Sequence, residues 1–205
     1  MPEVFEVADR IEVMRLGTRV ARLKPSDVSM EDVVAAMAST LKRTSRSMIG
    51  HGSHLIDTAR FLAGQEIVTV TADLAERGGA HCWFISVEFA DGSIGHLDLT
   101  MSVQMDWHEG FHIYGERGSV VAKSFLPWYH RASEVECFAA RDRQYHRPLG
   151  EDAHVWRRQV EGFADAILTG APQLGATVED GLAAMRVIDA IEHSVETGAS
   201  VTVAA

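Results

Sequence analysis

The chain has 205 residues, of which 46% are hydrophobic, enough to build the core of one large or two small globular domains. Its formal net charge of −10 at pH 7 argues against a nucleic-acid partner, because proteins that bind the phosphate backbone need a basic surface. No apolar run is long enough to span a bilayer, so no membrane partner is expected. The N-terminus does not resemble a signal peptide, and the two cysteines form no C-x-x-C pair. The sequence therefore predicts a cytoplasmic protein.

Residues 1–40 are predicted to form a small helix–hairpin–helix appendage. A short helix is expected at 2–9, and the stretch IEVMRL-GT-RVARLK that follows it is typical of two strands around a turn. Ser29 is a candidate N-cap for a second helix in MEDVVAAMAS. The basic, polar run at 41–47 has no apolar periodicity and is predicted to be a linker to a larger domain over 48–205.

Alternating polarity predicts an antiparallel sheet in this larger domain. In residues 83–89 and 97–103 the odd-numbered positions are apolar, which is the pattern of a hairpin with one buried face. The other expected elements are, in chain order, a helix at 53–63, a strand at 66–73, a hairpin at 110–123, a strand at 133–140, and helices at 152–169 and 178–197. The predicted fold class is therefore α+β, a largely antiparallel open sheet of about five or six strands with its helices on one face, without a Rossmann domain.

The segment HEGFH, residues 108–112, fits the H-E-x-x-H pattern of zinc proteases, in which two histidines one helical turn apart bind one metal ion. The segment lies between predicted strands and contains a glycine, so we expect it to be extended. In an extended chain His108 and His112 stand roughly 13 Å apart, at about 3.3 Å per residue, whereas zinc needs both nitrogens at about 2 Å. The match is predicted to be accidental, and no metal site is assigned.

The stretch SMIGHGSHLIDTARFLAG, residues 47–64, is the best candidate for chemistry. Its glycines lead into a predicted helix, on which His51, His54 and Asp57 follow one another at i, i+3 and i+6 and so lie along one side. Three interpretations are open. The side chains could form a small metal site, a histidine could only cap or pack the helix start, or a histidine could bind substrate and move a proton.

Residues 47–203 resemble the substrate domain of the Gfo/Idh/MocA oxidoreductases. Gly52, His54 and Asp57 match the family motif D-x-G-x-H-x-x-D, IYGERGSVVA resembles the hairpin of that domain, and residues 160–203 resemble its closing helices and final strand. The resemblance implies the substrate-binding half of an NAD(P)-dependent sugar or polyol dehydrogenase. It implies His54 as the general acid or base and His51 and Asp57 as substrate contacts, although Asp57 could equally be a surface or capping carboxylate.

The sequence departs from this family at three points. Gly50 stands where the motif has its first aspartate, no G-x-G-x-x-G follows a predicted strand, and the E-K-P motif that supplies a catalytic lysine is absent. The resemblance thus implies NAD or NADP as cofactor, but no cofactor-binding residue is assigned in this chain. We expect a truncated enzyme that is inactive alone, unless a partner chain supplies a nucleotide domain.

Residues 2–37 resemble the C-terminal tail of sugar ABC transporter ATP-binding subunits, without the phosphate-binding loop or signature motif, so no ATP site is assigned. A competing hypothesis therefore makes the chain a non-catalytic interaction or oligomerisation module, a gene-fusion remnant associated with such a transporter. Under either hypothesis we expect a homo-oligomer formed through the uncovered sheet face, which carries Phe84 beside His96, Asp98 and Thr100.

Overall fold

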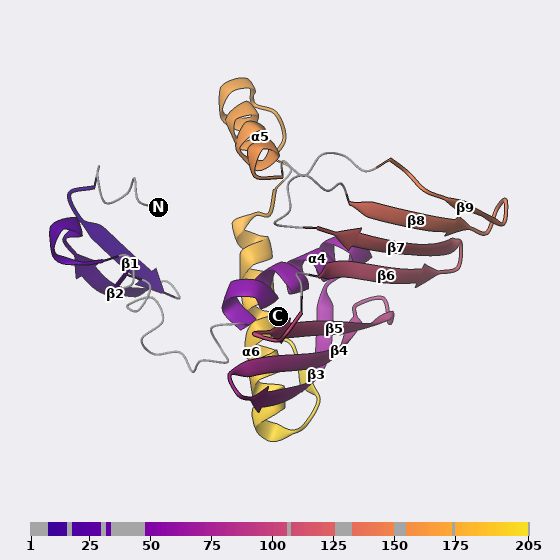
Figure 1. The fold of residues 1–205 in the computed structure, drawn as a ribbon, viewed down its shortest axis with the longest axis horizontal. Coiled ribbons are helices and arrows are strands. Elements are labelled where there is room, and N and C mark those ends of the chain that lie inside the picture. Colours follow the sequence, from indigo (N-terminus) through magenta and orange to yellow (C-terminus); the bar gives the residue numbers. More distant parts are fainter. Residues whose placement is uncertain are drawn as a thin grey trace. The chain divides into compact units, whose positions relative to one another are not determined.

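The computed structural model describes residues 8–15, 18–29, 32–33, 48–105, 108–125, 133–149, 155–173 and 175–204. The chain divides into two compact units (Figure 1). Unit 1 comprises Met1–Ser102 together with Val178–Ala205, and unit 2 comprises Val103–Thr177. Unit 1 is therefore built from both ends of the chain, and unit 2 is inserted between them. None of the helices described combines the length and the apolar composition needed to cross a bilayer.

The predicted N-terminal hairpin is confirmed. Strand β1 (Ile11–Arg15) pairs antiparallel with β2 (Thr18–Leu23), and the 3-10 turn η1 (Pro25–Asp27) follows. The backbone N–H of Asp32 donates to Oγ of Ser29 at 3.2 Å, as expected for the predicted N-cap. Most of the helix predicted at 2–9 and most of the one predicted in MEDVVAAMAS lie outside the described residues, and the described residues Ala8 and Asp9 are not helical.

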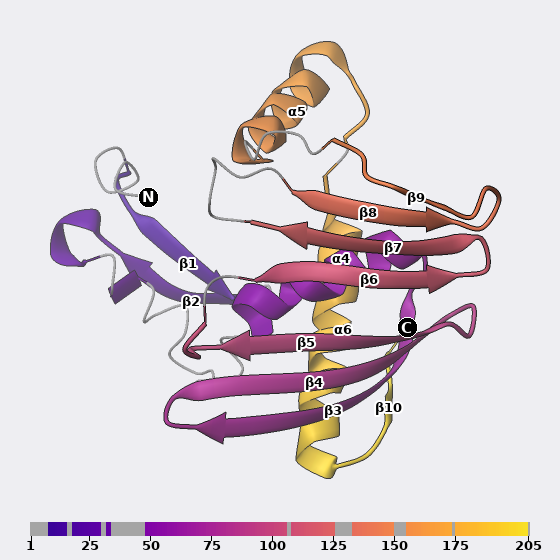
Figure 2. The same cartoon turned by 45° about the vertical axis from the view of Figure 1, so that its right-hand side comes forward.

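The larger part of unit 1 is an antiparallel sheet in the order β10-β3-β4-β5, packed on helices. Its elements are the π-helical turn η2 (Met48–Gly52), α4 (Ser53–Ala63), β3 (Ile67–Arg77), β4 (Ala80–Phe89), β5 (Ile94–Met101), α6 (Val178–Thr197) and β10 (Val201–Thr202). Gly64 ends α4 with a left-handed φ of 63°, and its N–H donates to the carbonyl of Arg60, which confirms the predicted helix end. Figure 2 shows α6 running behind the strands of this sheet.

The core of unit 1 lies between one face of this sheet and the helices α4 and α6. On β4 the odd-numbered residues are buried and the even-numbered ones from Phe84 onward are exposed, which confirms the predicted period of two. Helix α6 contributes Val187, Ile188 and Ile191 to the core. At its C-terminal end, Ser194 is fully buried, accepts a hydrogen bond from the Ala72 N–H at 2.9 Å and donates one to the Ala199 carbonyl at 2.6 Å.

Unit 2 contains a second antiparallel sheet, in the order β6-β7-β8-β9, and one helix. Its elements are β6 (Glu109–Gly115), β7 (Gly118–Ser124), β8 (Glu134–Ala139), β9 (Gln144–His146) and α5 (Val155–Thr169). The HEGFH segment is extended, as predicted, because its residues from Glu109 onward belong to β6. Gly118 has a φ of 148°, and a Cβ at this position would collide with the Phe138 carbonyl oxygen on the paired strand β8.

The arrangement differs from the predicted single sheet in two respects. Strand β5 ends at Met101, and the next residue, Ser102, adopts a left-handed φ of 60° that interrupts extended backbone, so the strands form two four-stranded sheets. Helix α5 itself is confirmed and has no buried residue, and the expectation that residues 152–169 cover a sheet face stays a prediction. The sequence also gave no signal for β9, whose three residues are all exposed.

Candidate functional site

The candidate site begins at the π-helical turn η2, which continues into α4 without a break. Gly52 joins the two with right-handed angles, φ −64° and ψ −30°. Met48 is fully buried, and a Cβ at Gly52 would collide with its sulfur atom, so the glycine lets this turn pack closely on the core. Single π-helical turns are frequent at functional sites, because they change the direction in which neighbouring side chains leave a helix.

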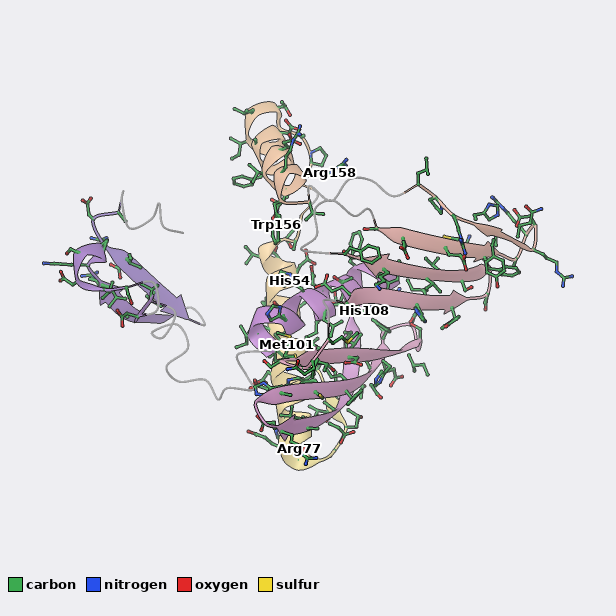
Figure 3. The ribbon with its side chains drawn as sticks, viewed as in Figure 1. His54, Arg77, Met101, His108, Trp156 and Arg158 are labelled. Atoms are coloured by element: carbon green, nitrogen blue, oxygen red, sulfur yellow. The ribbon has the colours of Figure 1, made fainter. Side chains whose placement is uncertain are left out.

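His51 and His54 are both exposed, and His54 lies in the first turn of α4 (Figure 3). Helical spacing places His51, His54, Thr58 and Phe61 along one exposed stripe, which we call the outer face of α4. Phe61 is the most open of them at 80% exposure. The structure thus places the two predicted histidines on one exposed side of neighbouring helical turns, and their role in catalysis stays a prediction.

Asp57, the third predicted site residue, is half-buried and lies off this stripe. Its Oδ1 atom accepts a hydrogen bond from Nη1 of Arg60 at 3.0 Å. This pairing favours the structural interpretation of the carboxylate, which the sequence had left open. Contact between Asp57 and a substrate stays a prediction.

Arg60 is the centre of an ion cluster that the sequence did not reveal. Its side chain is only 8% exposed, and it donates to both carboxylate oxygens of Glu66, from Nε at 2.8 Å and from Nη2 at 2.6 Å. Its nitrogens also lie 3.4 Å from the backbone carbonyl and from Oδ1 of Asp180. The hydrogen bonds from Arg60 lower the pKa of Glu66, and those bonds raise the pKa of Arg60. The cluster fixes α4 to the start of β3 and to the first turn of α6.

Gly50 occupies the position of the motif carboxylate, and packing does not require a glycine there. No atom lies within 4 Å of a Cβ added at Gly50, and its φ is not among the positive ones. The fold could therefore accommodate a carboxylate side chain at position 50, and packing does not explain why the sequence has a glycine there.

The described residues do not fit a dinucleotide or a metal ion. A dinucleotide needs a parallel β–α–β crevice with a glycine-rich turn, whereas every strand pair in the described ranges is antiparallel. Among these residues no group of three or more His, Cys, Asp or Glu side chains is arranged to hold a metal ion. A surface hollow in unit 2 is lined by Glu136, Tyr145 and Arg147, and it includes none of the predicted site residues.

One comparison concerns the transporter resemblance. The fructose import ATP-binding protein FrcA of Rhizobium meliloti is 57% identical to this chain over 37 residues, which are 18% of this chain and 14% of that protein. The match is short, and the assignment of residues 2–37 to a transporter tail stays a prediction.

The longer matches all concern oxidoreductases. Inositol 2-dehydrogenase 2 of Saccharopolyspora erythraea is 31% identical over 167 residues, which are 78% of this chain and 47% of that protein. The crystal structure of aldose-aldose oxidoreductase from Caulobacter crescentus shares the fold, with a TM-score of 0.63 at 20% identity over 76% of this chain and 47% of that one. The chain thus spans about half the length of these relatives. The family model described as GFO/IDH/MocA C-terminal domain matches residues 19–121, half of the chain, and the protein therefore belongs to this family as a C-terminal domain.

Proposed function

We propose that the chain is the substrate-binding half of an NAD(P)-dependent sugar or polyol dehydrogenase of the cytoplasm, and that it is inactive alone. The observation that carries this proposal is the exposed His54 at the first turn of α4, at the motif position, in a chain of this family. The similarity to inositol 2-dehydrogenase 2 favours a cyclic polyol as the substrate class.

In this proposal His54 moves the proton of the reaction. Oxidation of a secondary alcohol removes a proton from the hydroxyl group, and an imidazole beside that group can accept it. His51 lies on the same outer face of α4 and is placed to contact a second hydroxyl group, with Asp57 beside them on the helix. In this proposal a nucleotide domain supplied by a partner chain binds the cofactor.

We expect the chain alone to show no saturable binding when NADH is titrated while nicotinamide fluorescence is followed, and no reduction of NAD⁺ in the presence of myo-inositol. Positioning of two reactants accounts for roughly 7–11 kcal/mol of a barrier, and a chain without a nucleotide site cannot position them. The full-length Saccharopolyspora relative is the positive control. Saturable NADH binding in the micromolar range would contradict this part of the proposal.

We expect myo-inositol, at millimolar concentration, to shift the imidazole NMR signals of His51 and His54. The His54→Ala variant should weaken this binding about tenfold, because it removes one hydrogen-bonding partner of a substrate hydroxyl group, while Thr58→Ala, on the same outer face, should leave it within about twofold. His193, exposed on α6, serves as the internal reference. Equal shifts at His193 and His54, or none at either, would favour the alternative function.

The alternative is a non-catalytic interaction or oligomerisation module associated with a sugar ABC transporter. The short match to FrcA and the glycine at position 50 favour it. Both functions are compatible with a homo-oligomer formed through the outward face of the unit 1 sheet. On that face Phe84 is 44% exposed and stacks on His96, with ring centroids 6.0 Å apart and planes inclined by 21°. This mixed apolar and polar surface supports the proposed contact.

A further inference from the structure

The carboxylate of Asp57 is held by the fold at only one of its two oxygens. Oδ1 accepts a hydrogen bond from Nη1 of Arg60 at 3.0 Å, and within the described ranges Oδ2 makes no hydrogen bond. The side chain is 37% exposed, and Oδ2 is not among the buried atoms without a partner, so this oxygen is open to solvent. An ionised carboxylate accepts several hydrogen bonds, and Asp57 therefore has acceptor capacity that the described fold does not use.

Arg60 does not need Asp57 to balance its charge. Its guanidinium group donates to both oxygens of Glu66, at 2.8 and 2.6 Å, and such bidentate pairs are among the strongest that arginine forms. Oδ1 of Asp180 lies 3.4 Å from Nη2 and adds a second carboxylate. Both of these partners lie outside α4, so they fix the guanidinium group from outside the helix. The nearly buried arginine thus presents Nη1 to Asp57 in one defined orientation.

Asp57 stands beside the histidine to which the proposed function gives the proton transfer. It follows His54 by three positions on α4, and this spacing places two side chains about 5–6 Å apart at their Cβ atoms. His54 is exposed and Asp57 is half-buried. The imidazole and the open oxygen of the carboxylate can therefore contact neighbouring hydroxyl groups of the same polyol molecule.

We propose that Arg60 is a positioning residue of the substrate site and acts through Asp57. It holds Oδ1 of the carboxylate, and Oδ2 accepts a hydrogen bond from the substrate hydroxyl group next to the one that His54 deprotonates. The ligand is thus a polyol with two adjacent hydroxyl groups, both of which donate. The structural bond of Asp57 and its substrate contact use different oxygens, so they do not compete. This inference rests on the proposed function, because it requires the substrate to lie beside His54.

The test is a double-mutant cycle on the full chain, in which the imidazole NMR signals of His51 and His54 report the dissociation constant of myo-inositol. Asp57→Ala should weaken binding at least about tenfold, because a hydrogen bond to a charged acceptor is lost. Arg60→Met should weaken it about three- to tenfold, because Asp57 keeps its carboxylate but loses its orientation. The double variant should bind about as weakly as Asp57→Ala alone, since Arg60 acts on the substrate only through Asp57.

Two control variants separate positioning from a loss of stability. Ser194→Ala removes buried hydrogen bonds to Ala72 and Ala199 in the core of unit 1, and Arg186→Met repeats the arginine exchange at an exposed position of α6. Both should leave the dissociation constant within about twofold. Far-ultraviolet circular dichroism checks the fold of each variant. If Arg60→Met does not fold, Arg60→Lys takes its place in the cycle, because lysine keeps a cation but cannot hold Glu66 and Asp57 in the same geometry.

The positioning role is overturned if the two losses add, so that the double variant binds more weakly than Asp57→Ala by the factor that the Arg60 variant shows alone. It is also overturned if Ser194→Ala weakens binding as much as Arg60→Met, since lost stability would then explain both. A chain in which myo-inositol shifts neither histidine signal contradicts the proposed function itself, and the positioning role with it. Additive losses in a chain that binds myo-inositol contradict the positioning role alone.

Discussion

Replacement of Trp83 with alanine is expected to lower the free energy of unfolding of unit 1 by about 3–5 kcal/mol. Trp83 is 2% exposed and lies in the middle of β4, where it is paired with Leu74 on β3 and Leu99 on β5. Removal of its ring would leave a cavity between the sheet and the helices, which the close-packed surroundings can fill only in part. A domain of this size is stable by only about 5–15 kcal/mol, so the variant should lose a large fraction of its stability.

The neighbouring residue provides the control. Phe84 is also a large aromatic residue of β4, but it points to the other face of the sheet and is 44% exposed. Alanine at Phe84 should cost about 1 kcal/mol or less, because little of its contact surface is lost. Urea unfolding followed by far-ultraviolet circular dichroism measures both. Equal losses for the two variants would mean that the assignment of the buried face is wrong.

Replacement of Arg60 with methionine is expected to lower the free energy of unfolding by about 1–3 kcal/mol at pH 7. Methionine preserves much of the side-chain length but removes the cation, so the carboxylates of Asp57, Glu66 and Asp180 would face one another without compensation. The loss is smaller than for a fully buried ion pair, because the three carboxylates are between 37% and 60% exposed and water screens them. Lysine at this position should recover only part of the loss, since it cannot donate to both oxygens of Glu66.

The same variant should change how stability depends on pH. The pKa of Glu66 is lower in the folded protein than in the unfolded chain, mainly because Arg60 donates hydrogen bonds to the carboxylate. A carboxylate whose pKa is lowered by folding stabilises the folded protein at a pH above its pKa in the unfolded chain, which is about 4.3 for glutamate. This contribution is lost as the pH falls through the pKa of the same group in the folded protein. The difference in urea midpoint between the original chain and Arg60→Met should thus be largest near pH 7 and become smaller below about pH 4. A gap that is constant with pH would refute the assigned role of Glu66.

Local patterns predicted most of the secondary structure. The hairpin of β4 and β5 followed from strict alternation, because a side chain on each strand faces either the core or water. The end of α4 followed from Gly64, which adopts the left-handed conformation that other residues avoid. The exposed pair of His51 and His54 followed from spacing alone, since residues three apart share a helix face.

Features set by distant residues were not predicted. Arg60 interacts with Asp180, which is 120 positions away in the sequence, so no local pattern could reveal that part of the cluster. Its pairing with Asp57, three residues earlier on the same helix, is local and could have been found from the spacing. The division into two sheets was not predicted either, since β5 ends before a left-handed φ at Ser102, a residue type that does not usually mark a break.

The assembly of unit 1 from both ends of the chain has a consequence for synthesis on the ribosome. Domains generally fold as they emerge, but the core of unit 1 needs Val187, Ile188 and Ile191, which are translated after all of unit 2. The part of the sheet of β3, β4 and β5 that α6 covers must therefore stay exposed until Val178–Thr197 has left the exit tunnel. During that interval the nascent protein should be a substrate for chaperones that bind exposed apolar strands, and a stop codon even a few turns of helix early should yield a product that is degraded.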